Sequence, residues 1–302
     1  MIRSILAALF SFVLGNSALA QSCSVPNTLT NGTNADANQV MANLNAILAC
    51  VNNQAAPRGY LSGLTLSTAG GSASFGIAAG VATSDDATTS MKLAASSTKS
   101  TGAWAAGSAN GSLDTGSIAN NTWYHVFLIE RTDTAAVDVL ISQSPTSPTL
   151  PTSYTKKRRI GSMKTNGSFQ WIKFSQLGDE FLWDTAVTDA SNVAIADTVA
   201  HLLTLTVPTG VQIWALFHGQ AIGATNSDGR MYWSSPDKVD EAAGGGLATA
   251  GEGILSGLQT ATSFALTIRT NASAQVRYRA FAASGSFYAA TGGWIDRRGR
   301  DF

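Results

Sequence analysis

The sequence predicts a mainly β protein, in which a short N-terminal α-helix precedes two antiparallel β-sandwich or jelly-roll-like domains. Two observations favour this class. Charged residues make up only 13% of the 302 residues, against about 25% in ordinary soluble domains. Beyond residue 58 the chain is rich in Gly, Ala, Ser and Thr and carries short alternating apolar segments separated by turn residues, which is typical of strands. A single stretch before that point shows helical periodicity.

Residues 1–20 have the pattern of a secretory signal peptide. Arg3 precedes an apolar run from Ile5 to Leu14, and Ala18-Leu19-Ala20 supplies a small-x-small cleavage signal. The alternative, a membrane anchor, would need about 20 apolar residues. We therefore expect a protein exported by its N-terminal signal, located in a virion or outside the cell.

Two cysteines, Cys23 and Cys50, follow the signal. Export would place them in an oxidising compartment, where a disulfide between them is a natural interpretation. Free thiols and pairing between chains stay open, because the sequence does not supply the Cα separation.

A helix is predicted from Asn34 to Asn53, within an N-terminal docking or oligomerisation segment of residues 21–57. Thr33 followed by Asp36 is a helix start signal, and Pro57 ends the pattern. Apolar residues recur at spacings of three and four, which predicts an a/d heptad stripe. The oligomerisation candidates on this stripe, which begins at Ala37, are Val40, Leu44, Ile47 and Val51. Packing of this stripe on the protein's own β structure is an equal alternative.

The same region resembles a known family. Residues 29–40 read Leu-Thr-Asn-Gly-Thr-Asn-Ala-Asp-Ala-Asn-Gln-Val, followed by an Asn-rich helix. This motif resembles the N-terminal segment of phage tail-fibre and related virion proteins, and the stretch from Trp123 to Trp183 looks, less distinctively, like segments of phage-encoded β-rich proteins. The resemblance implies a homotrimer, other virion proteins as partners and a role in host attachment.

The first β domain is expected over residues 58–184. Trp123 to Arg131 alternates with apolar residues on both faces, and Val137 to Ile141 follows it as the second strand of a hairpin. A second hairpin is predicted from Ile160 to Met163 and from Phe169 to Phe174, around an Asn-Gly turn.

The second β domain is expected over residues 185–302, with the polar segment from Thr185 to Asp197 as the irregular boundary. Strands are predicted from Val199 to Val207 and from Val211 to Phe217. Phe264 to Ile268 and Val276 to Ala280 are interpreted as a hairpin around residues 270–274.

Binding candidates are aromatic and basic. Exposed aromatic rings stack on sugars, and arginines hold anionic groups through charge-assisted hydrogen bonds. A core position for the aromatics, and a solvated loop for the basic run at residues 156–159, are the alternatives. The candidates for glycan binding are Trp214, Tyr232, Trp233, Arg269, Arg277 and Arg279.

Several functional classes are disfavoured. With 19 basic and 19 acidic residues the formal net charge is zero, whereas nucleic-acid-binding proteins normally carry a basic excess. His125, His201 and His218 fall in apolar strand patterns, and metal-binding or serine-hydrolase motifs are absent from the sequence. We therefore expect no cofactor, no metal and no nucleic-acid partner.

The sequence thus predicts a non-enzymatic, phage tail-fibre-like structural and receptor-binding protein that recognises a glycan of the host envelope. One alternative is an exported glycan hydrolase (depolymerase) that uses Asp179, Glu180 or Asp184, since glycoside cleavage needs paired carboxylates. The other is a secreted bacterial adhesin.

Overall fold

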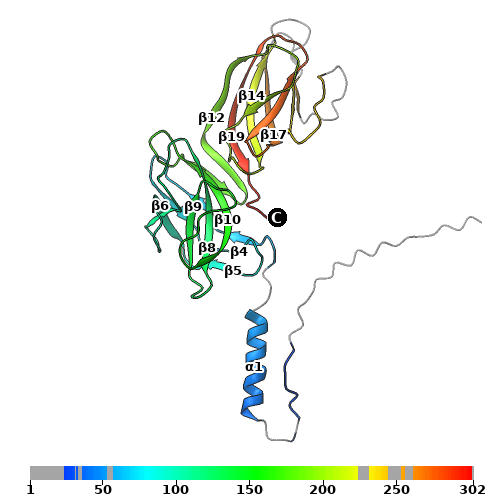
Figure 1. The fold of residues 1–302 in the computed structure, drawn as a ribbon. Coiled ribbons are helices and arrows are strands. Elements are labelled where there is room, and N and C mark those ends of the chain that lie inside the picture. The colour runs from blue at the N-terminus through cyan, green and yellow to red at the C-terminus, as the bar shows by residue number, and fades with distance from the viewer. Residues whose placement is uncertain are drawn as a thin grey trace, which may run out of the picture. The chain divides into compact units, whose positions relative to one another are not determined.

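The computed structural model describes residues 24–30, 32, 36–52, 57–223, 231–243, 253–255 and 261–300. The chain divides into two compact units, Met1–Ala55 and Ala56–Phe302. The first contains the helix α1 and the second contains strands β1 to β19 (Figure 1). The mainly β class with a short N-terminal helix is therefore confirmed.

Helix α1 spans Ala37–Asn52, slightly shorter than predicted. Its N-cap is Asp36, whose Oδ1 accepts a hydrogen bond of 2.8 Å from the Asn38 amide and whose carbonyl accepts one of 3.1 Å from Val40. The predicted cap Thr33 lies outside the described residues. The extended segment before the helix is held to it by Asn43, whose side-chain amide exchanges hydrogen bonds of 2.9 and 2.8 Å with the backbone of Asn27.

The N-terminal part of the second unit contains a seven-stranded and a three-stranded sheet. The seven-stranded sheet has the order β10 (Tyr154–Lys164), β8 (Trp123–Arg131), β9 (Val137–Ser142), β7 (Gly111–Leu113), β6 (Ser97–Ala103), β3 (Ser74–Ile77) and β2 (Leu66–Ser67). The three-stranded sheet has the order β1 (Leu61–Gly63), β4 (Gly80–Thr83) and β5 (Ser90–Leu93). Strand β10 forms one edge of its sheet, a position that becomes important below.

The predicted hairpin at Trp123 is confirmed as β8 and β9, which pair antiparallel with Phe127 opposite Leu140. Every residue of β8 except the last is buried, in agreement with the apolar pattern on both of its faces. The strand pairs of the seven-stranded sheet are antiparallel except at β7, which runs parallel to both β6 and β9.

The C-terminal part contains a five-stranded and a four-stranded sheet. The first has the order β11 (Phe174–Leu177), β12 (Glu180–Ala194), β19 (Ser286–Ile295), β14 (Trp214–Ile222) and β17 (Thr262–Arg269). The second has the order β13 (His201–Thr204), β18 (Gln275–Ala280), β15 (Met231–Ser234) and β16 (Gly253–Leu255). Aromatic rings of the two sheets meet, since Phe217 of β14 contacts Trp233 of β15 at 5.3 Å between centroids.

Strand β12 corrects the predicted domain boundary. Most of the segment from Thr185 to Asp197 is the second part of this 15-residue strand rather than an irregular linker. Its partner β19 pairs with it from Glu180 to Ala194, with several register shifts. The change from the first pair of sheets to the second falls earlier, between β10 and β11.

Two predicted hairpins are also wrong. After the turn at Asn166, Trp171 forms only isolated bridges to Thr165 and Ser72, and Phe174 then enters β11, which pairs with β12. Strands β17 and β18 are consecutive in the chain but belong to different sheets: β17 pairs with β14, whereas β18 pairs with β13 and β15. The segment between them is a corner that connects the two layers.

One core cluster runs through both parts of the second unit. At its centre Trp294 of β19 contacts Trp123 of β8 at 5.4 Å, Trp183 of β12 at 4.9 Å and Phe181 of β12 at 5.1 Å. Each such aromatic pair contributes about 0.5–1.5 kcal/mol beyond the burial of apolar area. These contacts join the seven-stranded and five-stranded sheets into one body.

Candidate ligand-binding site

The basic run at residues 156–159 lies in the edge strand β10 and not in a solvated loop. Its first two members reach surface carboxylates, with Lys156 paired to Asp86 and Lys157 paired to Asp85 at 2.7 Å. Its last two members turn inward, since the side chains of Arg158 and Arg159 are only 3% and 9% exposed. Burial of two adjacent guanidinium groups is costly unless each finds a partner.

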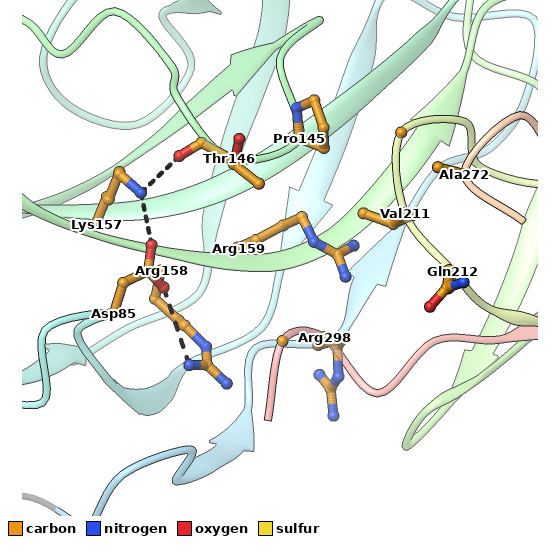
Figure 2. Close-up of a pocket in the computed structure, with 12 residues that line it drawn as sticks. Asp85, Pro145, Thr146, Lys157, Arg158, Arg159, Val211, Gln212, Ala272 and Arg298 are labelled. Carbon is orange, nitrogen blue, oxygen red and sulfur yellow. Dashed lines mark hydrogen bonds and ion pairs between the residues drawn. The ribbon is translucent and has the colours of Figure 1, made fainter. Parts of the chain in front are cut away.

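These two arginines line a cavity of about 370 Å³, which we call the arginine cavity (Figure 2). Arg158 and Arg159 come from β10, and Arg298 comes from the C-terminal segment that follows β19. The cavity is completed by residues of four loops. Its remaining lining residues are Asp85, Pro145, Thr146, Lys157, Gly210, Val211, Gln212, Ala272 and Gly299.

The positive charge of Arg159 is balanced by the carboxylate of Asp296. Its two terminal nitrogens donate to the two carboxylate oxygens of Asp296 at 2.6 and 2.7 Å, which is the bidentate geometry preferred by this pair. Burial favours the neutral form of both groups, but their mutual attraction outweighs it, so that the pKa of Arg159 is raised and the pKa of Asp296 is lowered. This pair forms a fixed wall of the cavity.

Arg298 and Arg300 share a single carboxylate, that of Asp179. Arg298 lies 3.0 Å from it, and its side chain is 4% exposed. Burial lowers the pKa of Arg298, although Asp179 opposes the shift. One carboxylate therefore serves two guanidinium groups at this side of the cavity.

Arg158 is the least compensated group. Its closest carboxylate is that of Asp85, 3.9 Å away and already paired to Lys157. Burial lowers the pKa of Arg158, and the nearby charges of Arg159, Arg300 and Arg298 lower it further while Asp85 opposes them. Among the described residues, four guanidinium N–H groups of this region are buried without a hydrogen-bond partner, namely Arg158 Nε and Nη2, Arg298 Nη1 and Arg300 Nε, and so are the indole N–H groups of Trp233 and Trp294 in the core. Such groups normally have one.

The histidine beneath this wall does not add charge. His125 is 1% exposed, and its Nδ1 lies 2.9 Å from the hydroxyl of Ser162. Burial lowers the pKa of His125 to about 3, with Arg159 contributing to the shift. The predicted core position of His125 is confirmed, but His218 is exposed and His201 is half exposed beside Asp197 at 2.7 Å.

A second hollow of about 360 Å³ adjoins the arginine cavity and contains two predicted binding residues, Trp214 and Arg269. The two hollows share Arg159 and Arg298 together with residues 211, 212 and 299. Trp214 is 39% exposed, so its ring is open to solvent. We call this second space the tryptophan hollow.

The other two aromatic candidates are not available to a ligand. Trp233 is 0% exposed and Tyr232 is 4% exposed, because all four residues of β15 are buried. Trp233 contacts Phe264 and Phe287 in the core between the two sheets. Their prediction as glycan-binding residues is wrong.

The three arginine candidates do not form one cluster. Arg269 lies on β17 of the five-stranded sheet, whereas Arg277 and Arg279 lie on β18 of the four-stranded sheet. Each binds protein groups. Arg269 pairs with Asp237 at 2.9 Å, Arg277 donates to the carbonyls of Pro236 and Lys238, and Arg279 pairs with Asp240 at 2.6 Å. These arginines hold the segment 236–240 in place.

Two of the three carboxylates considered for glycan hydrolysis form ion pairs with basic side chains. Asp179 binds Arg298 and Arg300, and Asp184 pairs with Lys173 at 2.8 Å. Within the described residues, no group of three or more His, Cys, Asp or Glu side chains is arranged to hold a metal ion.

On α1, Leu44 and Ile47 of the predicted stripe are 53% and 43% exposed, and Val40 is half-buried. Met41 and Leu48 are exposed beside them. The side chains of Val51 and Cys50, and all of Cys23, lie outside the described residues, so the disulfide stays a prediction. None of the described helices is long and apolar enough to cross a membrane.

Sequence reasoning missed Arg298, Asp296 and Asp85 as site residues. The only signal for Arg298 was the basic run at residues 297–300 near the C-terminus.

Comparison with protein-family models found no match, and comparison with curated proteins found no similar sequence.

Proposed function

We propose that the chain is a non-enzymatic, phage tail-fibre-like attachment protein that binds a glycan of a cell envelope. The N-terminal motif at residues 29–40 supports the virion role through its resemblance. The predicted signal peptide supports export, and the protein acts in a virion or outside the cell. Its partners are other virion proteins and the host glycan.

The observation that carries the binding role is the exposed ring of Trp214 in the tryptophan hollow. Indole rings stack on the apolar faces of sugar rings while the polar rim of a site binds the hydroxyl groups. Gln212 and Arg269 supply polar groups beside the indole. Among the aromatic residues predicted to bind glycan, Trp214 alone has its ring at the surface.

The test is binding of the purified protein to host cell-envelope polysaccharide, measured by surface plasmon resonance. We expect Trp214→Ala to weaken binding by about 5-fold or more, because loss of a stacking aromatic contact at a binding site costs above about 1 kcal/mol. Tyr288→Ala is the matched control. Tyr288 is 37% exposed on the neighbouring strand β19, and the tryptophan hollow does not include it. Equal effects of the two substitutions would contradict the proposal.

The exposed apolar residues of α1 support a second element of the proposal, association of the chain into a homotrimer through this helix. A heptad stripe buries its apolar side chains against the same stripe of another copy. Detection of the protein in purified particles, compared with culture supernatant alone, separates the virion role from that of a secreted adhesin.

The hydrolase alternative has its own test. Glu180→Gln and Asp184→Asn remove the two predicted catalytic carboxylates that are not shared by Arg298 and Arg300. If the wild-type protein cleaves the polysaccharide and these variants do not, the non-enzymatic proposal is overturned.

A further inference from the structure

We infer that the arginine cavity binds an oxyanion, a phosphate or carboxylate group, and that the glycan of the proposed function is therefore an anionic one. The inference deepens that function and rests on it for the identity of the ligand. The sequence pointed to the basic run at residues 156–159, which includes Arg158 and Arg159, but it did not point to Arg298.

The first argument is the balance of charge around the cavity. Three carboxylates, those of Asp85, Asp179 and Asp296, serve the five cations that surround the space. The cations are Lys157, Arg158, Arg159, Arg298 and Arg300. His125 adds no charge near neutral pH, because burial lowers its pKa to about 3. The described groups therefore leave an excess of two positive charges beside this space, which a bound anion would neutralise.

The second argument is the set of unused donors. Arg158 Nε and Nη2 and Arg298 Nη1 are buried without a partner among the described residues, although both side chains line the cavity. A guanidinium presents its N–H groups in a planar fork that matches the oxygens of carboxylate and phosphate. The two arginines come from different segments and both line this space (Figure 2). The unpartnered nitrogens are closed off from solvent, so an oxyanion in the cavity would bind them only after the guanidinium groups rotate toward it, and it would then supply the partner that the protein lacks.

The third argument is rigidity. Arg159 is held by two hydrogen bonds to Asp296, whose Oδ1 also accepts a hydrogen bond of 2.8 Å from the Arg298 amide. Asp179 holds the Arg298 side chain through Nε at 3.0 Å. Arg159 and the backbone of Arg298 are thus positioned before any ligand arrives, which lowers the entropic cost of binding.

The position of the cavity links it to the glycan. It shares Arg159 and Arg298 with the tryptophan hollow, so a saccharide with its ring on Trp214 would have an acidic substituent within reach of the cavity. Phosphorylated and uronic-acid-containing glycans both carry such a group. The experiment must therefore distinguish phosphate from carboxylate.

The test is thermal unfolding of the full chain at constant ionic strength in sodium phosphate, in sodium glucuronate and in sodium chloride. At ten times its Kd, a bound anion raises the Tm by about 3–6 °C relative to chloride for a unit of this size. We expect this rise in the wild-type protein with at least one of the two anions. The anion that produces it shows whether the site prefers phosphate or carboxylate.

The decisive variant is Arg158→Met, with Arg131→Met as the matched control. Arg131 pairs with Asp133 on the surface at 2.7 Å, so its replacement removes the same charge without touching the cavity. We expect Arg158→Met to abolish the anion-dependent rise and Arg131→Met to keep it. In chloride, Arg158→Met should melt no lower than the wild type, because an uncompensated buried charge is replaced by an apolar chain of similar length.

Should Arg158→Met fail to fold, Arg158→Lys replaces it as the test variant. It retains the positive charge but loses the planar fork of N–H donors, so we expect it to reduce the anion-dependent rise in Tm. General exclusion of phosphate from protein surfaces stabilises all variants alike. The inference is overturned if neither anion raises the wild-type Tm, or if the Arg158 variants show the same rise as the wild type.

The two proposals fail separately. Polysaccharide binding that requires Trp214, without any anion-dependent rise in Tm, would overturn the anion inference and leave the proposed function standing. An anion-dependent rise that survives in Trp214→Ala, in a protein that binds no polysaccharide, would overturn the proposed function.

Discussion

His125 makes the stability of the protein depend on pH. Its pKa is about 3 in the folded protein because of burial and the charge of Arg159, against about 6.5 in the unfolded chain. The unfolded state therefore binds the extra proton between these values, and the stabilising contribution present above pH 6.5 is lost as the pH falls toward 3. Between pH 7.5 and pH 5 the loss amounts to about 2 kcal/mol.

The variant His125→Gln keeps a polar group next to Ser162 and does not titrate. We expect urea unfolding to show that the wild type loses about 2 kcal/mol more free energy of unfolding than the variant between pH 7.5 and pH 5. Asp296 does not obscure this window, because its lowered pKa affects stability only at more acidic pH. If the free energy of unfolding of the two proteins falls equally between pH 7.5 and pH 5, His125 is not the group that causes the loss.

Single residues also show what a sequence leaves undetermined. Lys99 carries a charge, and no feature of its local sequence marks it as a core residue, yet its side chain is fully buried. There it pairs with Asp138 at 2.8 Å and donates to the carbonyls of Ala105 and Gly107. Trp233 and Trp214 are the same residue type in similar strand patterns, and only the packing of the second sheet decides which of them is buried. Exposure depends on tertiary contacts that local patterns do not contain.

At the level of elements, α1 carries the next prediction. We expect light scattering at micromolar concentration to show a trimer for the wild type and a monomer for Leu44→Lys, because a charge on the apolar stripe opposes its burial between helices. Asn45→Lys adds the same charge at an exposed polar position of the helix and should remain trimeric. A wild-type monomer would contradict the proposed association through α1.

Strands were predictable where their side chains are buried. The apolar alternation from Trp123 to Arg131 identified β8 correctly, because nearly the whole strand is in the core. The second part of β12 was missed, since only Ala190 is fully buried between Thr185 and Ala194, and an exposed strand has no hydrophobic signature. The change of sheet between β17 and β18 was missed because a short turn within a sheet and a corner between sheets use similar residues.

At the level of the whole molecule, the arginine cavity explains why the site was only partly predictable. The basic run at residues 156–159 was recognised, and two of the predicted binding residues, Trp214 and Arg269, line the same hollow. Asp85, Arg158 and Arg298 lie far apart in the sequence, and only the folded second unit brings them together. A cavity built from segments so far apart in the sequence leaves no spacing pattern to detect.

The second unit should unfold as one body. Trp294, Trp183 and Phe181 form a continuous aromatic cluster with Trp123 of the seven-stranded sheet, so that the cores of the two pairs of sheets are continuous. We expect calorimetry of a fragment of residues 57–302 to show a single transition. A fragment of residues 185–302 should lack cooperative unfolding and a near-ultraviolet circular dichroism signal, because the cut divides β12 and removes Phe181 and Trp183 from beneath Trp294. A cooperative transition of the shorter fragment would show that the cluster is not required and that a domain boundary near Trp183 is real.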